Sequence, residues 1–334
     1  MLRDCQAPQR DPEICDKGNL NRVDKARRAL ARRRYAKLRH MESLAAGGAY
    51  SQMANGVGLA LGAMVCYGLA DWVYKRAAGR GVQAHQFLML QAFFFAPGIL
   101  IYGAVTGTLS GGIPFVWGMA AGGLLFVALY NFARSLSSGA VTIVVPVFRL
   151  SFALTAALAV WLLNEPVTRW KIAGLVASLA AVWLLLGGHA TAGPRATPAS
   201  VMRVVLAMVT MSLVSLIYKV GVATGGTPAT VMMGQASVFV SLATAFAVWR
   251  DRGFHPPTGG WRYGATAAVL LLFAQVMLLA GLTRGEASVL VPVAQLSFVV
   301  TSVLGYVRLR ETLTPRKGFG LACAIAALAC LAQS

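Results

Sequence analysis

Apolar runs of about 20 residues recur along most of the chain, and they constrain its fold more than any other feature, because an α-helix of this length crosses a bilayer. The runs are too long and too uniformly apolar for membrane barrel strands, which alternate over about 10 residues. The segments between them are short and leave no room for a soluble domain. We therefore expect ten transmembrane helices, approximately at 57–75, 84–103, 115–135, 140–163, 170–187, 200–220, 229–248, 261–281, 286–308 and 316–332.

The composition agrees with a membrane protein, but the charge is unevenly distributed. Charged residues make up 12% of the chain, against about 25% in an average soluble domain. Of the 30 Lys and Arg, 12 lie in residues 1–52, a tail without the apolar segment of a signal peptide. We expect this tail to be disordered, or a mistranslated leader with Met53 as the true start. A surface helix that binds anionic lipids is the second interpretation; nucleic-acid binding is disfavoured, because no folded module accompanies the basic residues.

The apolar region is an internal duplication. Apolar helices match one another by chance at Leu and Ala, but ordered matches at Pro, Glu, Lys, Gln and Tyr require a repeat. A shift of 144 residues pairs Tyr74 with Tyr218 and Gln91 with Gln235. A shift of 146 residues pairs Pro146 with Pro292, Leu150-Ser151-Phe152 with Leu296-Ser297-Phe298, Glu165 with Glu311, and Lys171 with Lys317. We expect a first repeat at 53–190 and a second at 191–334.

The number of helices in each repeat predicts a mechanism. Five spans per repeat is an odd number, so the second repeat enters the membrane from the opposite side. Two inverted repeats related by a pseudo-two-fold axis can exchange conformations, which is the basis of alternating access. The sequence carries no HExxH motif, nucleophile elbow or phosphate loop. We therefore expect an all-α integral membrane transporter of ten helices in two inverted five-helix repeats, and not an enzyme.

Arg149 is the most informative polar residue within the spans, because an ionisable group in hydrocarbon is costly and indicates function. It lies nine residues into its expected helix, about 13 Å deep at 1.5 Å per residue. A guanidinium at this depth can bind a carboxylate or phosphate with two parallel bonds. Its repeat partner is Gln295, so the two could face one central cavity. The alternative is that Arg149 pairs with a buried acid or with backbone carbonyls.

Other polar residues in the spans are secondary candidates. Asp71 is a candidate for coupling or for binding an amino group, although Lys75, four residues later, offers a local ion pair. Pro146 and Pro292 are expected to act as paired hinges. Amides within the spans either line a cavity or bond across helix interfaces. These amides are Gln91, Gln235, Asn131 and Gln275.

Two copies of one motif resemble a known family. The stretch from Gly139 to Pro146, then Asn164-Glu165-Pro166 and Lys171-Ile172-Ala173-Gly174, is similar to the hallmark of EamA-type transporters of the drug/metabolite transporter superfamily. The second copy runs from Gly285 to Gly320. The resemblance implies a carrier of amino acids, nucleotide-like metabolites, sugars or drugs. The small multidrug subfamily resembles one repeat and carries a glutamate in its first helix. Tyr67 aligns with that glutamate, which disfavours proton-coupled cation antiport and makes Tyr67 a candidate binding residue.

These observations lead to an expected function. We expect an exporter of a small anionic or zwitterionic metabolite such as an amino acid, with Arg149 holding the acidic group. Efflux of lipophilic cations is the second hypothesis, favoured by Phe93-Phe94-Phe95 but opposed by the charge of Arg149. A membrane scaffold is the third. We expect a small-molecule substrate and the lipid bilayer as partners, no nucleic acid, no cofactor and no metal, with a homodimer left open.

The charge distribution gives opposing signals on orientation. Loops after odd-numbered helices hold 13 Lys and Arg, whereas loops after even-numbered helices hold four. The positive-inside rule alone would place the amino terminus outside, but the tail's 12 basic residues cancel this preference. The resemblance implies the bacterial inner membrane with both termini in the cytoplasm.

Overall fold

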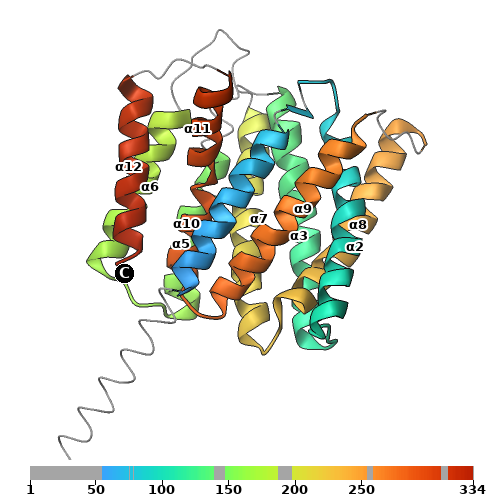
Figure 1. Cartoon of the computed structure of the whole chain (residues 1–334), viewed down its shortest axis with the longest axis horizontal. Coiled ribbons are helices and arrows are strands. Elements are labelled where there is room, and N and C mark those ends of the chain that lie inside the picture. Colours follow the sequence, from blue (N-terminus) through green and yellow to red (C-terminus); the bar gives the residue numbers. More distant parts are fainter. Residues whose placement is uncertain are drawn as a thin grey trace, which may run out of the picture. The chain divides into compact units, whose positions relative to one another are not determined.

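A computed structural model describes residues 55–74, 76–77, 79–138, 147–186, 198–253, 259–309 and 315–333, and in these ranges every regular element is an α-helix. The tail, Lys75, Pro146 and Glu311 lie outside the described residues. The first helix, Asn55–Tyr74, precedes the labelled helices of Figure 1. The labelled helices are α2 (Ala84–Thr106), α3 (Ile113–Ser138), α5 (Ser151–Leu163), α6 (Arg169–Leu186), α7 (Pro198–Ala223), α8 (Pro228–Asp251), α9 (Trp261–Leu282), α10 (Ala287–Gln295), α11 (Ser297–Leu309) and α12 (Pro315–Leu331).

Six of the described helices are long and apolar enough to cross a membrane. Five of them are complete helices: the first helix, α2, α7, α8 and α9. The sixth is the part of α3 from Ile113 to Phe132. Turn chemistry sets several of their ends. Gly107 ends α2 in a left-handed conformation with φ 62°, and Thr227 caps α8 by accepting a bond from the Thr230 N–H, with Pro228 next to it. The remaining described helices are shorter, so the count of ten spans stays a prediction.

The expected spans at 140–163 and 286–308 are each interrupted at repeat-related residues. Residues 147–149 are helical, Leu150 forms a turn, and α5 starts at Ser151. In the second repeat α10 ends at Gln295, and α11 starts after Leu296, whose ψ is 8°. Pro292 lies inside α10, four residues before this break, where it removes a backbone donor. Leu150 and Leu296 are related by the same shift as the motif copies, so both repeats break the same helix at the same place.

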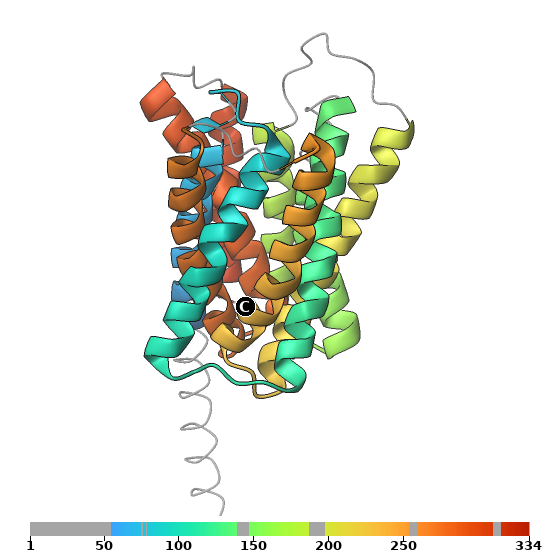
Figure 2. The ribbon, with the colours of Figure 1, turned by 90° about the vertical axis from the view of Figure 1, so that its right-hand side faces the viewer.

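The helices pack across the repeats in matching pairs (Figure 1). The third helix of each repeat packs on the second helix of the other: α3 on α8, and α9 on α2. Two pairs join counterparts directly, α2 with α8 and α6 with α12. Figure 2 shows α8 between α2 and α3. This exchange of partners is the contact pattern of a pseudo-two-fold axis between the repeats.

Glycines allow the backbones to approach closely at these paired contacts. A Cβ added at Gly118 or Gly122 of α3 would overlap the carbonyl oxygens of Val231 and Gln235 on α8. Gly264, the counterpart of Gly118 on α9, would place its Cβ 2.9 Å from the Leu90 Cβ on α2. Small residues at helix interfaces are the main way in which membrane helices gain packing contacts.

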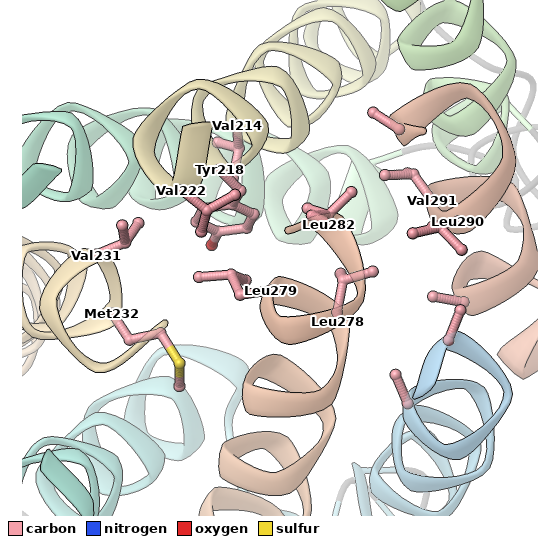
Figure 3. Packing of buried hydrophobic residues seen from close by; sticks show 14 of the residues in the cluster. Val214, Tyr218, Val222, Val231, Met232, Leu278, Leu279, Leu282, Leu290 and Val291 are labelled. Atoms are coloured by element: carbon pink, nitrogen blue, oxygen red, sulfur yellow. The ribbon is translucent and has the colours of Figure 1, made fainter. Parts of the chain in front are cut away.

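The bundle is apolar on its outside as well as in its core. Side chains of α7, α8, α9 and α10 converge in the cluster of Figure 3, which includes Tyr218, Leu279 and Leu290. Ile101 and Phe319, by contrast, are 63% and 69% exposed. Exposed apolar patches of this kind are unfavourable in water and typical of a surface in contact with lipid.

The two ends of the bundle are formed by different helix termini. We call one of them the α10 end, because α10 begins there, while α5, α7 and α9 terminate there. Glu165, which follows α5, accepts bonds from the first N–H groups of α10 at this end. Lys219 near the end of α7 bonds the carbonyl of Leu282, the last residue of α9. At the opposite end, the first residues of α2 meet the last residue of α8, where His85 lies 2.8 Å from Asp251.

Candidate functional site

The first helix carries a polar stripe formed by Tyr67, Asp71 and Tyr74. Residues spaced four and three apart lie on one face of a helix. Each of the three bonds to a different part of the bundle. The Tyr67 hydroxyl donates to Gln275 on α9, and the Tyr74 hydroxyl donates to Gln91 on α2. Asp71, between them, reaches the two broken helices.

Arg149 connects Asp71 to the second repeat. Its Nη2 lies 3.0 Å from the Asp71 Oδ2, and its Nη1 donates to the Gln295 Oε1 at 3.2 Å. The Ser297 hydroxyl lies 3.4 Å from the same Asp71 oxygen. Arg149 and Gln295 each directly precede the break of their helix, at Leu150 and Leu296. Broken helices of this kind form the substrate and ion sites of many transporters built from repeats.

The pair of charges is only partly buried. The Arg149 side chain is 18% exposed and the Asp71 side chain 36%. Opposite charges that neutralise one another are the usual way to hold ionisable groups at membrane depth. Asp71 therefore pairs with Arg149 across the bundle, and its expected local partner, Lys75, lies outside the described residues. Arg149 thus meets an acid, as the alternative from the sequence has it, and Gln295 lies next to it. That Arg149 and Gln295 face a shared central cavity stays a prediction.

The other amides form a second cluster. Tyr218 on α7 donates to the Gln235 Oε1 at 2.5 Å and accepts from the Gln275 Nε2 at 2.9 Å. Gln275 also receives the bond from Tyr67, so it joins this cluster to the polar stripe. These amides are buried, and each has a hydrogen-bond partner, as buried polar groups require. Their role in binding a substrate remains a prediction.

The tyrosine to glutamine bond occurs in both repeats. Tyr74 bonds Gln91 in the first, and Tyr218 bonds Gln235 in the second. The glutamines are among the residues that the sequence predicts for the site, whereas these tyrosines are not. The signal was present, because a single shift of the sequence relates both members of each pair.

Two further candidates lie elsewhere. Asn131 on α3 donates to the carbonyl of Val127, one turn earlier in its own helix, at 2.8 Å, and joins neither cluster. Pro292 lies within α10, close to the break that precedes Ser297. Its expected hinge partner, Pro146, falls outside the described residues.

A charged cluster at the α10 end joins the repeats a second time. Glu165 accepts bonds from the N–H groups of Ala287 and Ser288 at 2.8 and 2.9 Å, so it caps the helix of the other repeat. Lys171 forms an ion pair with Glu286. Lys219 donates to the carbonyls of Leu282 and Gly285. A cavity of about 370 Å³ lies here, lined by Leu163, Glu165, Lys219, Val220, Ala223, Thr224 and Glu286.

The cap also fixes the relative direction of two packed helices. The carboxyl end of α5 lies at the amino end of α10, and the two helices pack together. They therefore run antiparallel. α5 continues in the direction of residues 147–149, and these residues are the counterparts of residues 293–295 in α10. Equivalent helices of the two repeats therefore run in opposite directions.

Comparison with known families assigns the chain to a family. A model of the EamA-like transporter family matches residues 54–187 and matches again at residues 199–333. The chain belongs to the EamA-like transporter family. The resemblance in the two motif copies is thus confirmed. EamA-like proteins are membrane transporters rather than enzymes, and this chain is a multi-pass membrane protein with two EamA repeats.

A solved structure has the same fold as this EamA-like chain. One protein crystal structure is similar with a TM-score of 0.72 over 82% of this chain and 95% of that chain, at 17% identity. At this identity the likeness extends to the fold alone. No curated protein matches the chain.

Proposed function

We propose that this EamA-like protein is a secondary transporter that exports a small anionic or zwitterionic metabolite, with an amino acid as the best fit. The observation that carries the proposal is the contact of Arg149 with both Asp71 and Gln295 at two matching helix breaks. The sequence contains no phosphate loop for ATP, so the driving force is an ion gradient or the gradient of the solute itself.

The Arg149 to Asp71 pair favours a zwitterion among the candidate substrates. A substrate carboxylate can replace Asp71 on the guanidinium, while the substrate ammonium then pairs with the released Asp71. Every charge keeps a partner in this exchange. An anion alone would leave Asp71 without its cation, and a lipophilic cation on Asp71 would leave Arg149 unpaired. Breaking a fully buried ion pair costs of order 3–5 kcal/mol; this partly exposed pair would lose less, and the sign of the effect still disfavours the cation hypothesis.

The paired helix breaks support alternating access. Leu150 and Leu296 interrupt equivalent helices at the point where Arg149 and Gln295 meet. The antiparallel course of α5 and α10 and the exchanged contacts of α2, α3, α8 and α9 support inverted repeats of five spans each. Asp71 is the candidate for ion coupling, because a coupling cation bound to its carboxylate would compete with Arg149.

We further propose that the protein lies in the bacterial inner membrane with both termini in the cytoplasm. An even number of spans places both termini on one side. A cytoplasmic reporter fused after Ser334 should be active, whereas activity of a periplasmic reporter alone would reverse the orientation.

Transport in liposomes tests the substrate proposal. The purified protein should move labelled amino acids, Arg149→Ala should abolish the flux, and Arg149→Lys should restore only part of it, because an ammonium lacks the planar pair of donors. Asn131→Ala is the matched control, since Asn131 bonds only within its own helix in the described structure. Unchanged flux in Arg149→Ala would overturn the binding role. Export of cationic dyes without amino-acid flux would support the drug hypothesis, and no flux of either would support a scaffold.

A further inference from the structure

The two repeats differ at the ion pair that joins them at the α10 end. Lys171, on α6 of the first repeat, pairs with Glu286, directly before α10 of the second. The sequence matches Lys171 with Lys317, but it places Ala140 where the counterpart of Glu286 would stand, in Gly139-Ala140 against Gly285-Glu286. The basic residue of the pair therefore occurs in both repeats, as Lys171 and Lys317, whereas the acidic residue occurs in the second repeat alone, as Glu286.

The residues that form the neighbouring contacts do not share this asymmetry in the sequence. Glu165 caps α10, and the sequence repeats this acid at Glu311. Lys219 bonds the carbonyls at the end of α9, and the sequence repeats this base at Lys75. Of these charged residues at the α10 end, Glu286 is the one without a charged counterpart in the first repeat, where Ala140 stands instead. The Lys171 to Glu286 pair is therefore the contact for which the sequence provides no equivalent at the opposite end.

The burial of Lys171 makes the loss of this ion pair costly. The Lys171 side chain is 3% exposed and the Glu286 side chain 28%. Lys171 also donates to the carbonyl of Pro166 at 2.6 Å, but only Glu286 neutralises its charge within bonding distance in the described structure. Glu286 occupies the N-cap position of α10 without capping it, so its carboxylate serves Lys171 instead. Separating the pair would leave a buried ammonium without an anion, which is strongly unfavourable.

We propose that Lys171 and Glu286 form a one-sided latch, which holds the α10 end closed and makes the state that is open toward the opposite end the resting state. The inference rests on the alternating access proposed above. Two inverted repeats with identical contacts would close either end with similar free energy. The sequence gives the Lys171 to Glu286 pair no counterpart in the other repeat, so this pair shifts that balance, because it stabilises only the conformation in which it forms.

The burial pattern agrees with a closed α10 end. Residues 287–294 of α10 are all buried. Asp71, in contrast, keeps 36% of its side chain exposed. The first helix begins at the α10 end, where Gly56 lies beside Gly281, and Asp71 follows 15 residues later, about 22 Å along a helix that rises 1.5 Å per residue. The exposed carboxylate is therefore nearer the opposite end.

Cysteine labelling in open membrane fragments tests the latch without any substrate. Ser288, the second residue of α10, lies two residues after Glu286 and is fully buried, so Ser288→Cys, in the full chain with its five native cysteines replaced by serine, reports access to the α10 end. An impermeant maleimide should label it slowly. Labelling should become about 10-fold faster in Lys171→Met with Glu286→Ala, which removes both charges; tenfold corresponds to about 1.4 kcal/mol of bias. Reversing the pair, with Lys171→Glu and Glu286→Lys, should restore slow labelling.

The second variant introduces the acidic residue that the first repeat lacks at the position equivalent to Glu286. By the repeat relation, Ala140→Glu puts an acid at the position equivalent to Glu286, where we expect it to pair with Lys317, the counterpart of Lys171. It should therefore favour closure of the opposite end and also speed labelling of Ser288→Cys. This variant leaves the α10 end intact, so faster labelling cannot come from damage to it. Arg169→Gln, a charge change at an exposed residue of the same end, should have no effect.

The outcomes separate the latch from the substrate proposal. Unchanged labelling in both the double-neutral and the Ala140→Glu variants would overturn the latch. If labelling responds as expected while no amino acid is transported, the latch stands and the substrate assignment fails. Arg149→Ala should keep slow labelling even though it abolishes flux, because the Lys171 to Glu286 pair is intact.

Discussion

Arg149 and Gln295 are hydrogen-bonded to each other at 3.2 Å although 146 residues separate them, which is the shift that superimposes the two repeats. Equivalent positions of an inverted repeat meet only on the pseudo-two-fold axis. The two residues therefore mark that axis at the helix breaks. They also differ in charge, so the site on the axis is asymmetric even though the scaffold is nearly symmetric.

Removing the charge of Asp71 should change selectivity. In Asp71→Asn the side chain keeps its size, but it can no longer pair with a substrate ammonium. Amino-acid flux should fall at least about tenfold, since a hydrogen bond to a charged group contributes about 1.5–3 kcal/mol. The flux of carboxylates without an amine should rise relative to the flux of amino acids, because Arg149 then no longer forms an ion pair with residue 71. Competition assays in liposomes measure both effects. Ser297→Ala, which removes a long bond of 3.4 Å to Asp71, is the control and should lose little. Equal loss for both substrate types would contradict the pairing of the ammonium with Asp71.

The Tyr218 hydroxyl should contribute to stability. Tyr218→Phe removes one donor to Gln235 and one acceptor for Gln275 while keeping the ring in place. Leaving buried amides unsatisfied costs about 1–3 kcal/mol, so the thermal midpoint in detergent should fall by several degrees. Tyr102→Phe is the control, because the described structure shows no hydrogen bond from the Tyr102 hydroxyl. A midpoint equal to that of the unmodified protein would mean that water satisfies these amides.

Adjacent glycines in α3 should respond oppositely to the same change. Gly122→Ala places a methyl group against the Gln235 carbonyl and forces α3 and α8 apart, at a cost of about 1–3 kcal/mol for overpacking. Gly123→Ala meets Val238 Cγ1 at 3.9 Å, an ordinary contact. Gly123→Ala should be neutral or slightly stabilising, since alanine favours helix. Thermal unfolding of both variants in one detergent gives the comparison, and similar midpoints would refute the close approach.

Glu165 should stabilise the start of α10. Glu165→Ala removes the acceptor of two N–H groups, which should cost about 0.5–2 kcal/mol as for other helix caps. Glu165→Gln keeps an oxygen acceptor and should lose less. Hydrogen exchange at Ala287 and Ser288 should accelerate in Glu165→Ala. No change in exchange at these two amides would show that the cap is dispensable.

Several parts of the site could be predicted because the duplication is visible in the sequence. The longer of the two shifts pairs Arg149 with Gln295, and the shorter one pairs Gln91 with Gln235. The approximate helix positions followed from hydropathy alone. The family followed from the two motif copies, whose Pro, Glu and Lys residues recur at matching positions.

Contacts between helices could not be predicted in the same way. The partner of Asp71 depends on how the first helix is rotated against residues 147–149, which one sequence does not specify. Asn131 has the polarity of a cavity residue, yet it bonds its own helix. The breaks at Leu150 and Leu296 occur at apolar residues that carry no turn signal, four residues after Pro146 and Pro292.

The exchanged packing of α3 on α8 and of α9 on α2 has a consequence for how the chain is made. Neither repeat can cover its own glycine faces, because the helix that fits each face belongs to the other repeat. During synthesis the helices of the first repeat must therefore remain incompletely packed in the bilayer until the helices of the second repeat emerge from the ribosome. Cutting the chain between α6 and α7 should yield two fragments that are unstable when expressed separately and that assemble when co-expressed.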